Sequence, residues 1–294
     1  MQNVTKNMYK ARSIFICRHP VHQKFDFAVS PYHILKQKKC YKKGCVEFLW
    51  RCNVGVKGKK CPRGYKHVGH NCFSCKYYYE EKICRIPESL VDDQTLAQFF
   101  KDLDDYEFWL SMVCGRKVEF SGKVASVYPS LLKTIDNDKS FIKMSGFLIT
   151  FDCGYIGDDL FDDTIYLQTS AHFLSKWQPA PGDELDFEAK LNNDRGRIVL
   201  TKPSRVEIAR CGAQPIIDYS KALVGRATGI IVSDDIRLCR NCPYGALLDV
   251  EEIRPKQNKY RRFYCLRGVE FSKDCLVRLE RKLQEYFQTQ TSTE

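Results

Sequence analysis

The cysteines of the first 90 residues restrict the possible folds more than any other feature of this chain. Eight of the fifteen cysteines lie there, in a segment rich in lysine and glycine that has no helical periodicity. Such a segment buries too little apolar surface to fold unaided, so it needs cross-links. The N-terminus has no apolar signal segment. This predicts a reducing, cytoplasmic location, where clustered cysteines bind metals rather than form disulfides.

One group of cysteines has the spacing of a metal-binding knuckle. Cys72 and Cys75 form a CxxC pair, which allows both thiolates to face one metal ion. Cys61 precedes this pair and Cys84 follows it, each within reach along the sequence. The spacing therefore predicts a metal site made by Cys61, Cys72, Cys75 and Cys84.

A second group, upstream, has three cysteines and needs a fourth ligand. Its members are Cys40, Cys45 and Cys52. Cys17 is the preferred fourth ligand because tetrahedral zinc sites favour thiolates. Histidines are the alternatives, namely His19, His22 or His33 here and His67 or His70 in the knuckle group. Sequence order does not fix the pairing, so the two groups could exchange ligands, and Cys52, which follows the residues "FLW", could instead belong to the core.

The third group lies near the C-terminus and consists of Cys239, Cys242, Cys265 and Cys275. The segments "CRNCPYGALLDV" and "RRFYCL" resemble a zinc ribbon, which has a knuckle, a hairpin and a return strand. A ribbon would have a second CxxC pair, whereas Cys275 falls in the first turn of a helix predicted over 273–287. The positive end of the helix dipole favours a thiolate there. The three groups predict two or three zinc ions, with an iron–sulfur cluster as the alternative, since both accept four thiolates.

The rest of the sequence specifies no reaction. It contains no GxxxxGK[ST], HExxH or GxSxG motif. The acidic residues from Asp158 to Asp163 are expected to form a solvated loop rather than a magnesium site. Cys114, Cys153 and Cys211 are isolated in the sequence and are predicted to be small buried hydrophobic residues, not ligands. Enzymatic activity is therefore not expected.

Residues 116–210 have the pattern of a small β-barrel. Alternating or continuous apolar residues predict five strands, at 118–124, 142–151, 164–168, 185–191 and 198–208. A short helix over 171–177 is predicted between the third and fourth strands, and Pro203 predicts a bulge in the fifth. This order and the segment "PGDELDFEAKL" resemble the OB-fold, a five-stranded barrel common in nucleic-acid-binding proteins. The predicted fold class is β-rich α+β, with a central OB-fold-like five-stranded barrel flanked by two cysteine-ligated metal modules.

The predicted organisation has four parts. Residues 1–90 form a metal-binding module, 91–115 a connecting helix, 116–210 the barrel, and 211–294 the zinc-ribbon-like module with its C-terminal helix. Asp92 or Asp93 is the expected N-cap of the connecting helix. Residues 211–236 are expected to be a linker with a short β-like piece at 228–232. No apolar run approaches the length of a membrane span.

Positive charge is concentrated before the barrel. Residues 1–90 hold 19 lysines and arginines against 5 acidic residues, a net +14, whereas residues 91–210 hold 14 against 20, a net −6. Basic and aromatic residues alternate in two segments, as in surfaces that bind single-stranded nucleic acid. The first segment supplies Lys57, Lys59, Lys60, Arg63, Lys66, Tyr77, Tyr78 and Tyr79. The second supplies Lys256, Lys259, Arg261 and Arg262.

These observations predict a non-catalytic protein that binds nucleic acid and is stabilised by structural zinc. Single-stranded nucleic acid or RNA is the expected ligand, and the choice between DNA and RNA stays open. One alternative is an iron–sulfur redox sensor or electron-transfer subunit. Another is a zinc-stapled assembly adaptor, in which the positive charge serves a protein partner.

Overall fold

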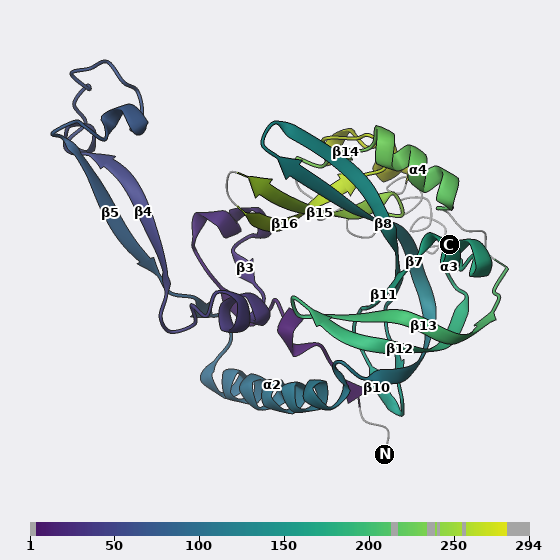
Figure 1. The fold of residues 1–294 in the computed structure, drawn as a ribbon. Helices are drawn as coiled ribbons and strands as arrows, with labels where there is room; N and C mark the ends of the chain where they lie inside the picture. Colours follow the sequence, from purple (N-terminus) through teal and green to yellow (C-terminus); the bar gives the residue numbers. More distant parts are fainter. Residues whose placement is uncertain (1–3, 213–216, 234–238, 240–241, 255–256, 281–294) are drawn as a thin grey trace, which may run out of the picture. The chain divides into compact units, whose positions relative to one another are not determined.

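The computed structural model describes residues 4–212, 217–233, 239, 242–254 and 257–280. It is β-rich, with helices and a large mixed sheet (Figure 1). The chain divides into two compact units. The smaller unit is Met8–Asp105, and the larger unit combines Met1–Asn7 with Tyr106–Glu294. The boundary falls within helix α2 (Asp93–Val113).

Five strands of the larger unit pair in a ring. They are β7 (Lys117–Asp136), β8 (Lys139–Phe151), β11 (Ile165–Thr169), β12 (Glu184–Asp194) and β13 (Arg197–Ala209). From β7 the pairing runs to β8 and β11, then in parallel to β13, and through β12 back to β7 (Figure 1). Helix α3 (Ala171–Trp177) lies between β11 and β12 in the sequence. All five predicted strands and this helix are confirmed as elements.

Alternate side chains of these strands form the core of the larger unit. The Phe120 ring lies 4.7 Å from the Phe151 ring and 5.0 Å from the Phe187 ring. Burying each such side chain stabilises the fold by about 1.5–3 kcal/mol. Gly122 and Gly154 lie against Phe120, where an added Cβ would come within 2.7 Å and 2.6 Å of ring atoms. The other fully buried large residues of the ring include Phe147, Ile149, Ile165, Leu167, Leu185, Leu191 and Ile198.

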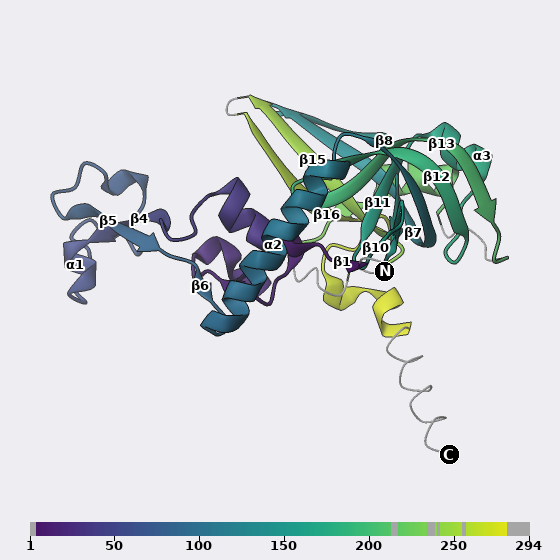
Figure 2. The same ribbon diagram turned by 90° about the horizontal axis from the view of Figure 1, so that it is seen from below.

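The second half of β7 carries a further part of the same sheet. Leu131–Asp136 pair in parallel with β15 (Gly245–Arg254), which continues to β16 (Asn258–Cys265) and β14 (Ile230–Ile231). Figure 2 shows β15 and β16 beside the long ends of β7 and β8. The residues of the predicted zinc-ribbon-like hairpin thus belong to one sheet with the ring.

Local sequence rules place several helix ends. Asp92 caps α2, since its Oδ1 accepts the Thr95 N–H at 2.8 Å. Ser170 caps α3 in the same way, accepting the Phe173 N–H at 3.2 Å. The predicted cap at Asp92 is confirmed. The predicted bulge in the fifth strand is confirmed as well, because the register shifts where Glu188 faces Ser204 and Lys190 faces Thr201.

The prediction of a linker over 211–236 is wrong in one respect. A helix, α4 (Tyr219–Thr228), occupies its middle. The Asp218 carboxylate caps it by accepting the Lys221 N–H at 2.8 Å. Gly225 and Thr228 weaken the helical pattern in the sequence, but Gly225 allows close packing, since an added Cβ would lie 3.0 Å from Leu266. The helix predicted over 273–287 lies partly outside the described residues, and within them Ser272–Asp274 form the 3-10 helix η6.

The smaller unit has a compact base and a two-stranded ribbon. The base contains a sheet of β2 (Phe15–Ile16), β3 (Ala28–Val29) and β6 (Glu88–Ser89). The Phe15 ring of this sheet packs edge-on to the Phe99 ring of α2 at 5.6 Å. The ribbon consists of β4 (Cys45–Cys52) and β5 (Tyr78–Arg85) (Figure 1). The remaining short elements of this unit are η1 (Met8–Lys10), η2 (Pro20–Phe25), η3 (Tyr32–Gln37), α1 (Asn53–Val56) and η4 (His70–Cys72). Those of the larger unit are β1 (Val4–Thr5), β9 (Gly154–Ile156) and β10 (Asp159–Phe161).

Candidate nucleic-acid interface and cysteine clusters

The ribbon fixes the positions of most predicted site residues. Cys45 pairs with Arg85 at one end, here called the near end, and Cys52 pairs with Tyr78 at the other. Residues 53–77 join the two strands beyond Cys52 and are here called the distal loop. On β4 the apolar residues Val46, Phe48 and Trp50 alternate with Glu47, Leu49 and Arg51, as a strand requires.

Aromatic rings gather where the distal loop meets the ribbon. The Trp50 ring lies 5.0 Å from the His70 ring and 5.0 Å from the Phe73 ring. Phe73 also contacts Tyr78, at 5.1 Å. The cluster is exposed, with 40% of Trp50 and 48% of Phe73 open to solvent. Trp50 was not among the predicted site residues, because apolar residues that alternate along a strand ordinarily indicate a buried face.

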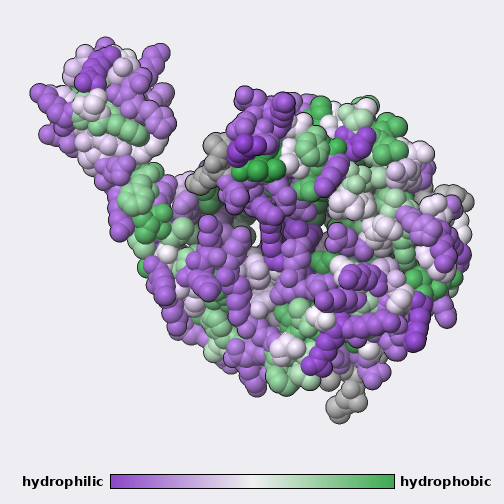
Figure 3. Space-filling view, in the orientation of Figure 1, coloured by the Kyte–Doolittle hydropathy of each residue, from purple (hydrophilic) through white to green (hydrophobic). Residues whose placement is uncertain are grey.

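The basic residues of the distal loop are exposed around these rings. No ion pair within the described part of the chain involves Lys57, Lys59, Lys60 or Lys66. Figure 3 shows hydrophilic residues around a smaller apolar area at the end of the ribbon. Arg63 has a structural contact, since its guanidinium donates to the Asn71 carbonyl at 3.5 Å. The predicted lysines are thus exposed in the same loop that carries His70 and Phe73 of the aromatic cluster.

The three predicted tyrosines differ in their contacts. Lys76 lies 5.1 Å from the centre of the Tyr77 ring. The Tyr78 hydroxyl donates to the Glu80 carboxylate at 2.9 Å, which holds that ring against Phe73. Tyr79 pairs with Arg51 across the ribbon. All three rings are partly buried, so Trp50 and Phe73 offer more exposed ring surface.

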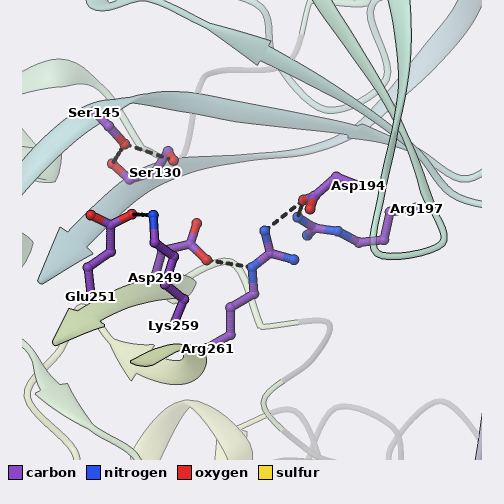
Figure 4. Close-up of polar contacts among 8 residues, drawn as sticks. All are labelled: Ser130, Ser145, Asp194, Arg197, Asp249, Glu251, Lys259 and Arg261. Carbon is purple, nitrogen blue, oxygen red and sulfur yellow. Dashed lines mark hydrogen bonds and ion pairs between the residues drawn. The ribbon is translucent and has the colours of Figure 1, made fainter. Parts of the chain in front are cut away.

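The second predicted basic segment is held in ion pairs (Figure 4). Lys259 Nζ lies 2.7 Å from the Glu251 carboxylate on β15. Arg261 bridges Asp249 and Asp194, at 2.6 Å from each. Its guanidinium thereby connects β16 to the end of β12. These two side chains already have carboxylate partners, so they are poor candidates for phosphate binding.

The other two predicted residues of that segment are Arg262 and Lys256. Arg262 is exposed, and its guanidinium lies 5.2 Å from the centre of the Tyr260 ring. Lys256 lies outside the described residues.

Asp194, the partner of Arg261, has a lowered pKa. Burial opposes ionisation of its carboxyl, but hydrogen bonds from Arg197 and Arg261 outweigh that effect.

Four cysteines lie in or beside the distal loop. Cys52 ends β4, opposite Tyr78. The Tyr78 N–H donates to Cys75 O at 2.9 Å, and the Cys75 N–H donates to Cys72 O at 2.8 Å, so the CxxC pair folds back against the end of the ribbon. Cys61 opens a turn in which the Gly64 N–H donates to its carbonyl at 3.0 Å. Arg63 connects this turn to Asn71, the residue before Cys72.

Cys84 lies at the near end instead. It pairs with Val46, and its sulfur lies 3.6 Å from the Lys43 carbonyl. A Cβ added to Gly44 would lie 2.3 Å from that sulfur. The register places Cys84 at the opposite end of the ribbon from Cys52 and Tyr78. Six residues of extended strand separate Cys84 from Tyr78, a length of about 20 Å.

Three more cysteines are at the near end. Cys17 and Cys40 are buried. Burial raises the pKa of the Cys40 thiol, and the nearby thiols of Cys45 and Cys17 raise it further. The Gly44 N–H donates to Cys40 O at 2.7 Å, so the turn from Cys40 to Cys45 also passes the Cys84 sulfur. Cys45 thus lies at the near end with Cys84, whereas Cys52 lies at the other end of the ribbon.

The histidines considered as alternative ligands have other contacts. His19 Nδ1 accepts the Val21 N–H at 3.3 Å, and His33 Nδ1 lies 3.1 Å from Gln37 Oε1. Burial lowers the pKa of His33. The His22 ring packs edge-on to that of His33 at 5.0 Å. His70 packs on Trp50 and Phe73, and His67 is exposed.

The C-terminal cysteines surround one cavity of about 20 Å³. Its lining includes Cys239, Cys242, Cys265 and Cys275. A cavity of this size accommodates about one water-sized particle. The Cys242 N–H donates to Cys239 O at 3.1 Å, which closes the knuckle, and the Leu279 N–H donates to Cys275 O at 3.3 Å, as in the first turn of a helix. All four residues of the predicted third group are therefore brought together.

The cysteine side chains of the distal loop, the near end and the C-terminal group are not arranged as metal ligands. Among the residues that the structure describes, no set of three or more cysteine, histidine or acidic side chains has metal-binding geometry.

Cys114, Cys153 and Cys211 are exposed, so the prediction that they are buried is wrong. The acidic segment is not wholly the predicted loop, since Asp159–Phe161 form strand β10. Asp159 accepts the Trp109 indole N–H at 3.1 Å, and Asp162 pairs with Lys6 at 3.3 Å.

The chain matches no protein-family model, no curated protein and no solved structure. Function therefore has to be argued from the site alone. One structural restriction applies to the described residues. Their helices are all too short or too polar to cross a membrane.

Proposed function

We propose that the protein binds single-stranded nucleic acid through the distal loop and has no catalytic role. One observation carries the proposal: exposed aromatic rings lie at the same end of the ribbon as lysines that form no ion pair with any residue the structure describes. Trp50 and Phe73 supply faces on which bases can stack. Lys57, Lys59, Lys60 and Lys66 supply charge for phosphates.

Phosphate contacts and stacked bases each add to the affinity of such a surface, and both accept any nucleotide sequence. Each lysine that contacts a phosphate releases condensed counterions, which makes affinity depend strongly on salt. Each base stacked on an aromatic ring contributes roughly 1–3 kcal/mol. Neither contact reads base edges, so little sequence preference is expected. RNA and single-stranded DNA are both compatible with this chemistry.

The ring of strand pairings supports an OB-fold-like barrel in the larger unit. Its order, with a parallel pair β11–β13 and α3 before β12, has the connectivity expected of that fold. A barrel of this kind would provide a rigid support, and nucleic-acid binding is one of its common uses. The proposal does not depend on the barrel, because the lysines and rings that carry it belong to the smaller unit.

Structural zinc is the metal we assign to the cysteine groups. Thiolates are the preferred ligands of structural zinc, and Zn²⁺ would cross-link segments that have little core of their own. At the C-terminal group, the support for this assignment is that four cysteines line one cavity of about 20 Å³. The metal's role here is to hold loops in place. The cysteines are its ligands, and the lysines and rings bind the nucleic acid.

The test is a salt titration of labelled single-stranded DNA and RNA. The variant replaces Lys57, Lys59, Lys60 and Lys66 by alanine and leaves Arg63, which has a structural contact. If all four contact phosphates, the slope of log affinity against log salt should flatten by about 2.8. A matched control replaces four exposed lysines of the larger unit, Lys123, Lys139, Lys190 and Lys202, which removes the same charge.

The outcomes separate the alternatives. A slope that changes in the distal-loop variant but not in the control supports the proposal. Equal changes in both would mean that net charge, not this site, attracts the polyanion. If the intact protein binds neither DNA nor RNA at low salt, the lysines serve a protein partner and the proposal fails.

A further inference from the structure

The length of the ribbon limits which cysteines can share a metal ion. Seven residues separate Cys45 from Cys52 along β4. At about 3.4 Å per residue, the two ends are about 24 Å apart. Two sulfurs bound to one zinc ion are at most about 4.6 Å apart, because each Zn–S bond is about 2.3 Å. A ligand at one end therefore cannot join a site at the other.

The antiparallel register sorts the strand cysteines differently from their sequence order. Cys52, which precedes the distal loop, ends β4 beside the segment that carries Cys72 and Cys75. Cys84, which follows the loop, returns along β5 to the near end. Grouping by sequence proximity would place both of these residues at the wrong end.

Contacts with the main chain place the remaining cysteines at the two ends of the ribbon. At the distal end, the Arg63 contact with Asn71 holds the turn that begins at Cys61 close to Cys72. At the near end, Gly44 has a φ of +77° and lies so close to the Cys84 sulfur that a side chain would displace it. Cys40 and Cys45 flank that turn.

We propose that the smaller unit holds two zinc ions whose ligand sets interleave along the sequence. The distal set is Cys52, Cys61, Cys72 and Cys75, and the near set is Cys17, Cys40, Cys45 and Cys84. Binding at each set exchanges four thiol protons, released to solvent, for one Zn²⁺, and the site then carries two negative charges. The inference rests on the proposed zinc binding but not on the nucleic-acid ligand.

Pairs of substitutions test the grouping in the full-length protein. Zinc per chain is counted after a chelator wash that removes weakly held metal. Cys52→Ser with Cys72→Ser should cost one ion, because both residues serve the distal set. Cys72→Ser with Cys84→Ser should cost two, because each set loses a ligand. Grouping by sequence order predicts the reverse, and that reverse result would overturn the proposal.

Cys45→Ser with Cys84→Ser is the matched double variant for the near set. It should cost one ion under the interleaved sets and two under sequence order. A protein that binds no zinc in the smaller unit would refute the proposal without bearing on nucleic-acid binding. Conversely, the expected zinc counts in a protein that binds neither DNA nor RNA would support the two ligand sets and contradict only the proposed function.

A second measurement covers variants that fail to fold. In the unmodified protein loaded with ¹¹³Cd²⁺, the cysteine β protons couple to the metal that their sulfur binds. The β protons of Cys52 and Cys75 should correlate with one cadmium resonance, and those of Cys45 and Cys84 with another. A shared resonance for Cys84 and Cys75 would overturn the proposal.

Discussion

The β4–β5 ribbon and the β15–β16 hairpin are built from similar residues but are supported differently. Each is an antiparallel pair with basic and aromatic side chains and with cysteines near an end. The β15–β16 hairpin joins the large sheet through β7 and buries Leu248 completely. Among the described strands, none pairs with the β4–β5 ribbon as a third strand, and Phe48 on β4 is 57% exposed.

The difference shows that composition alone does not identify an interface. Lysines and arginines next to tyrosines occur in both hairpins. In β15–β16, Arg261 and Lys259 are neutralised by carboxylates on neighbouring strands. In the distal loop, the lysines have no such neighbours in the described structure. A two-stranded ribbon is also only marginally stable by itself, so the ribbon depends on cross-links more than the hairpin does.

Metal removal should produce the largest difference in stability between the β4–β5 ribbon and the large sheet. Structural zinc contributes roughly 10–16 kcal/mol in small modules. Chelation should therefore abolish amide protection in the ribbon while the β7–β8 and β12–β13 pairings stay protected. Hydrogen exchange followed by peptide mass analysis would show this. Full protection of the ribbon in metal-free protein would contradict the dependence on zinc.

Arg261→Met should break the hairpin's own support. The change leaves Asp249 without its partner, and Asp194 keeps only Arg197. We expect a loss of roughly 1–3 kcal/mol in the free energy of unfolding, measured by urea denaturation. Lys259→Met is the control, because its pair with Glu251 is exposed and should contribute about 1 kcal/mol or less. Neither variant should change the affinity for single-stranded nucleic acid, and a loss of affinity in either would weaken the contrast.

The same ion pairs predict a pH dependence of smaller size. The folded-state pKa of Asp194 lies below its ordinary value, because Arg197 and Arg261 outweigh the effect of burial. Its contribution to stability is therefore present above the unfolded pKa of about 3.9 and is lost as pH falls through the folded value. The stability difference between the unmodified protein and Asp194→Asn should shrink from pH 6 to pH 3. A difference that stays constant would rule out this linkage.

The three isolated cysteines should matter least. Cys114, Cys153 and Cys211 are exposed and belong to none of the three groups. Replacing all three by serine should leave the zinc count unchanged and alter the unfolding free energy by about 0.5 kcal/mol per site. Cys211 is the most sensitive, since its sulfur lies 3.3 Å from the Pro181 carbonyl. Loss of a metal ion from the triple variant would show that a ligand had been missed.

Local patterns predicted the elements that depend on near neighbours in sequence. The alternation from Leu185 to Leu191 predicted β12, and the cap at Asp92 predicted the start of α2. Helix α4 was missed because Gly225 and Thr228 interrupt its pattern, while packing against Leu266 favours the helix in the folded protein.

The arrangement of the candidate sites was harder to predict because it depends on register. The pairing of Cys52 with Tyr78 follows from how two strands align, which spacing along the sequence does not encode. The ion pair of Arg261 with Asp194 joins segments 67 residues apart, so the sequence could not predict it either. The CxxC pairs, by contrast, are local and could be found at once.

The pairing between β7 and β15 also has a consequence for synthesis on the ribosome. Leu131 meets its partner Leu248 only after more than a hundred further residues have been added. At 5–20 residues per second, that interval lasts roughly 6–24 s. During this time β8 can cover one edge of β7, but the other edge stays open to pairing with foreign strands. Lys133 and Asp136 lie on that edge and place charges where a nascent chain would otherwise be prone to aggregate.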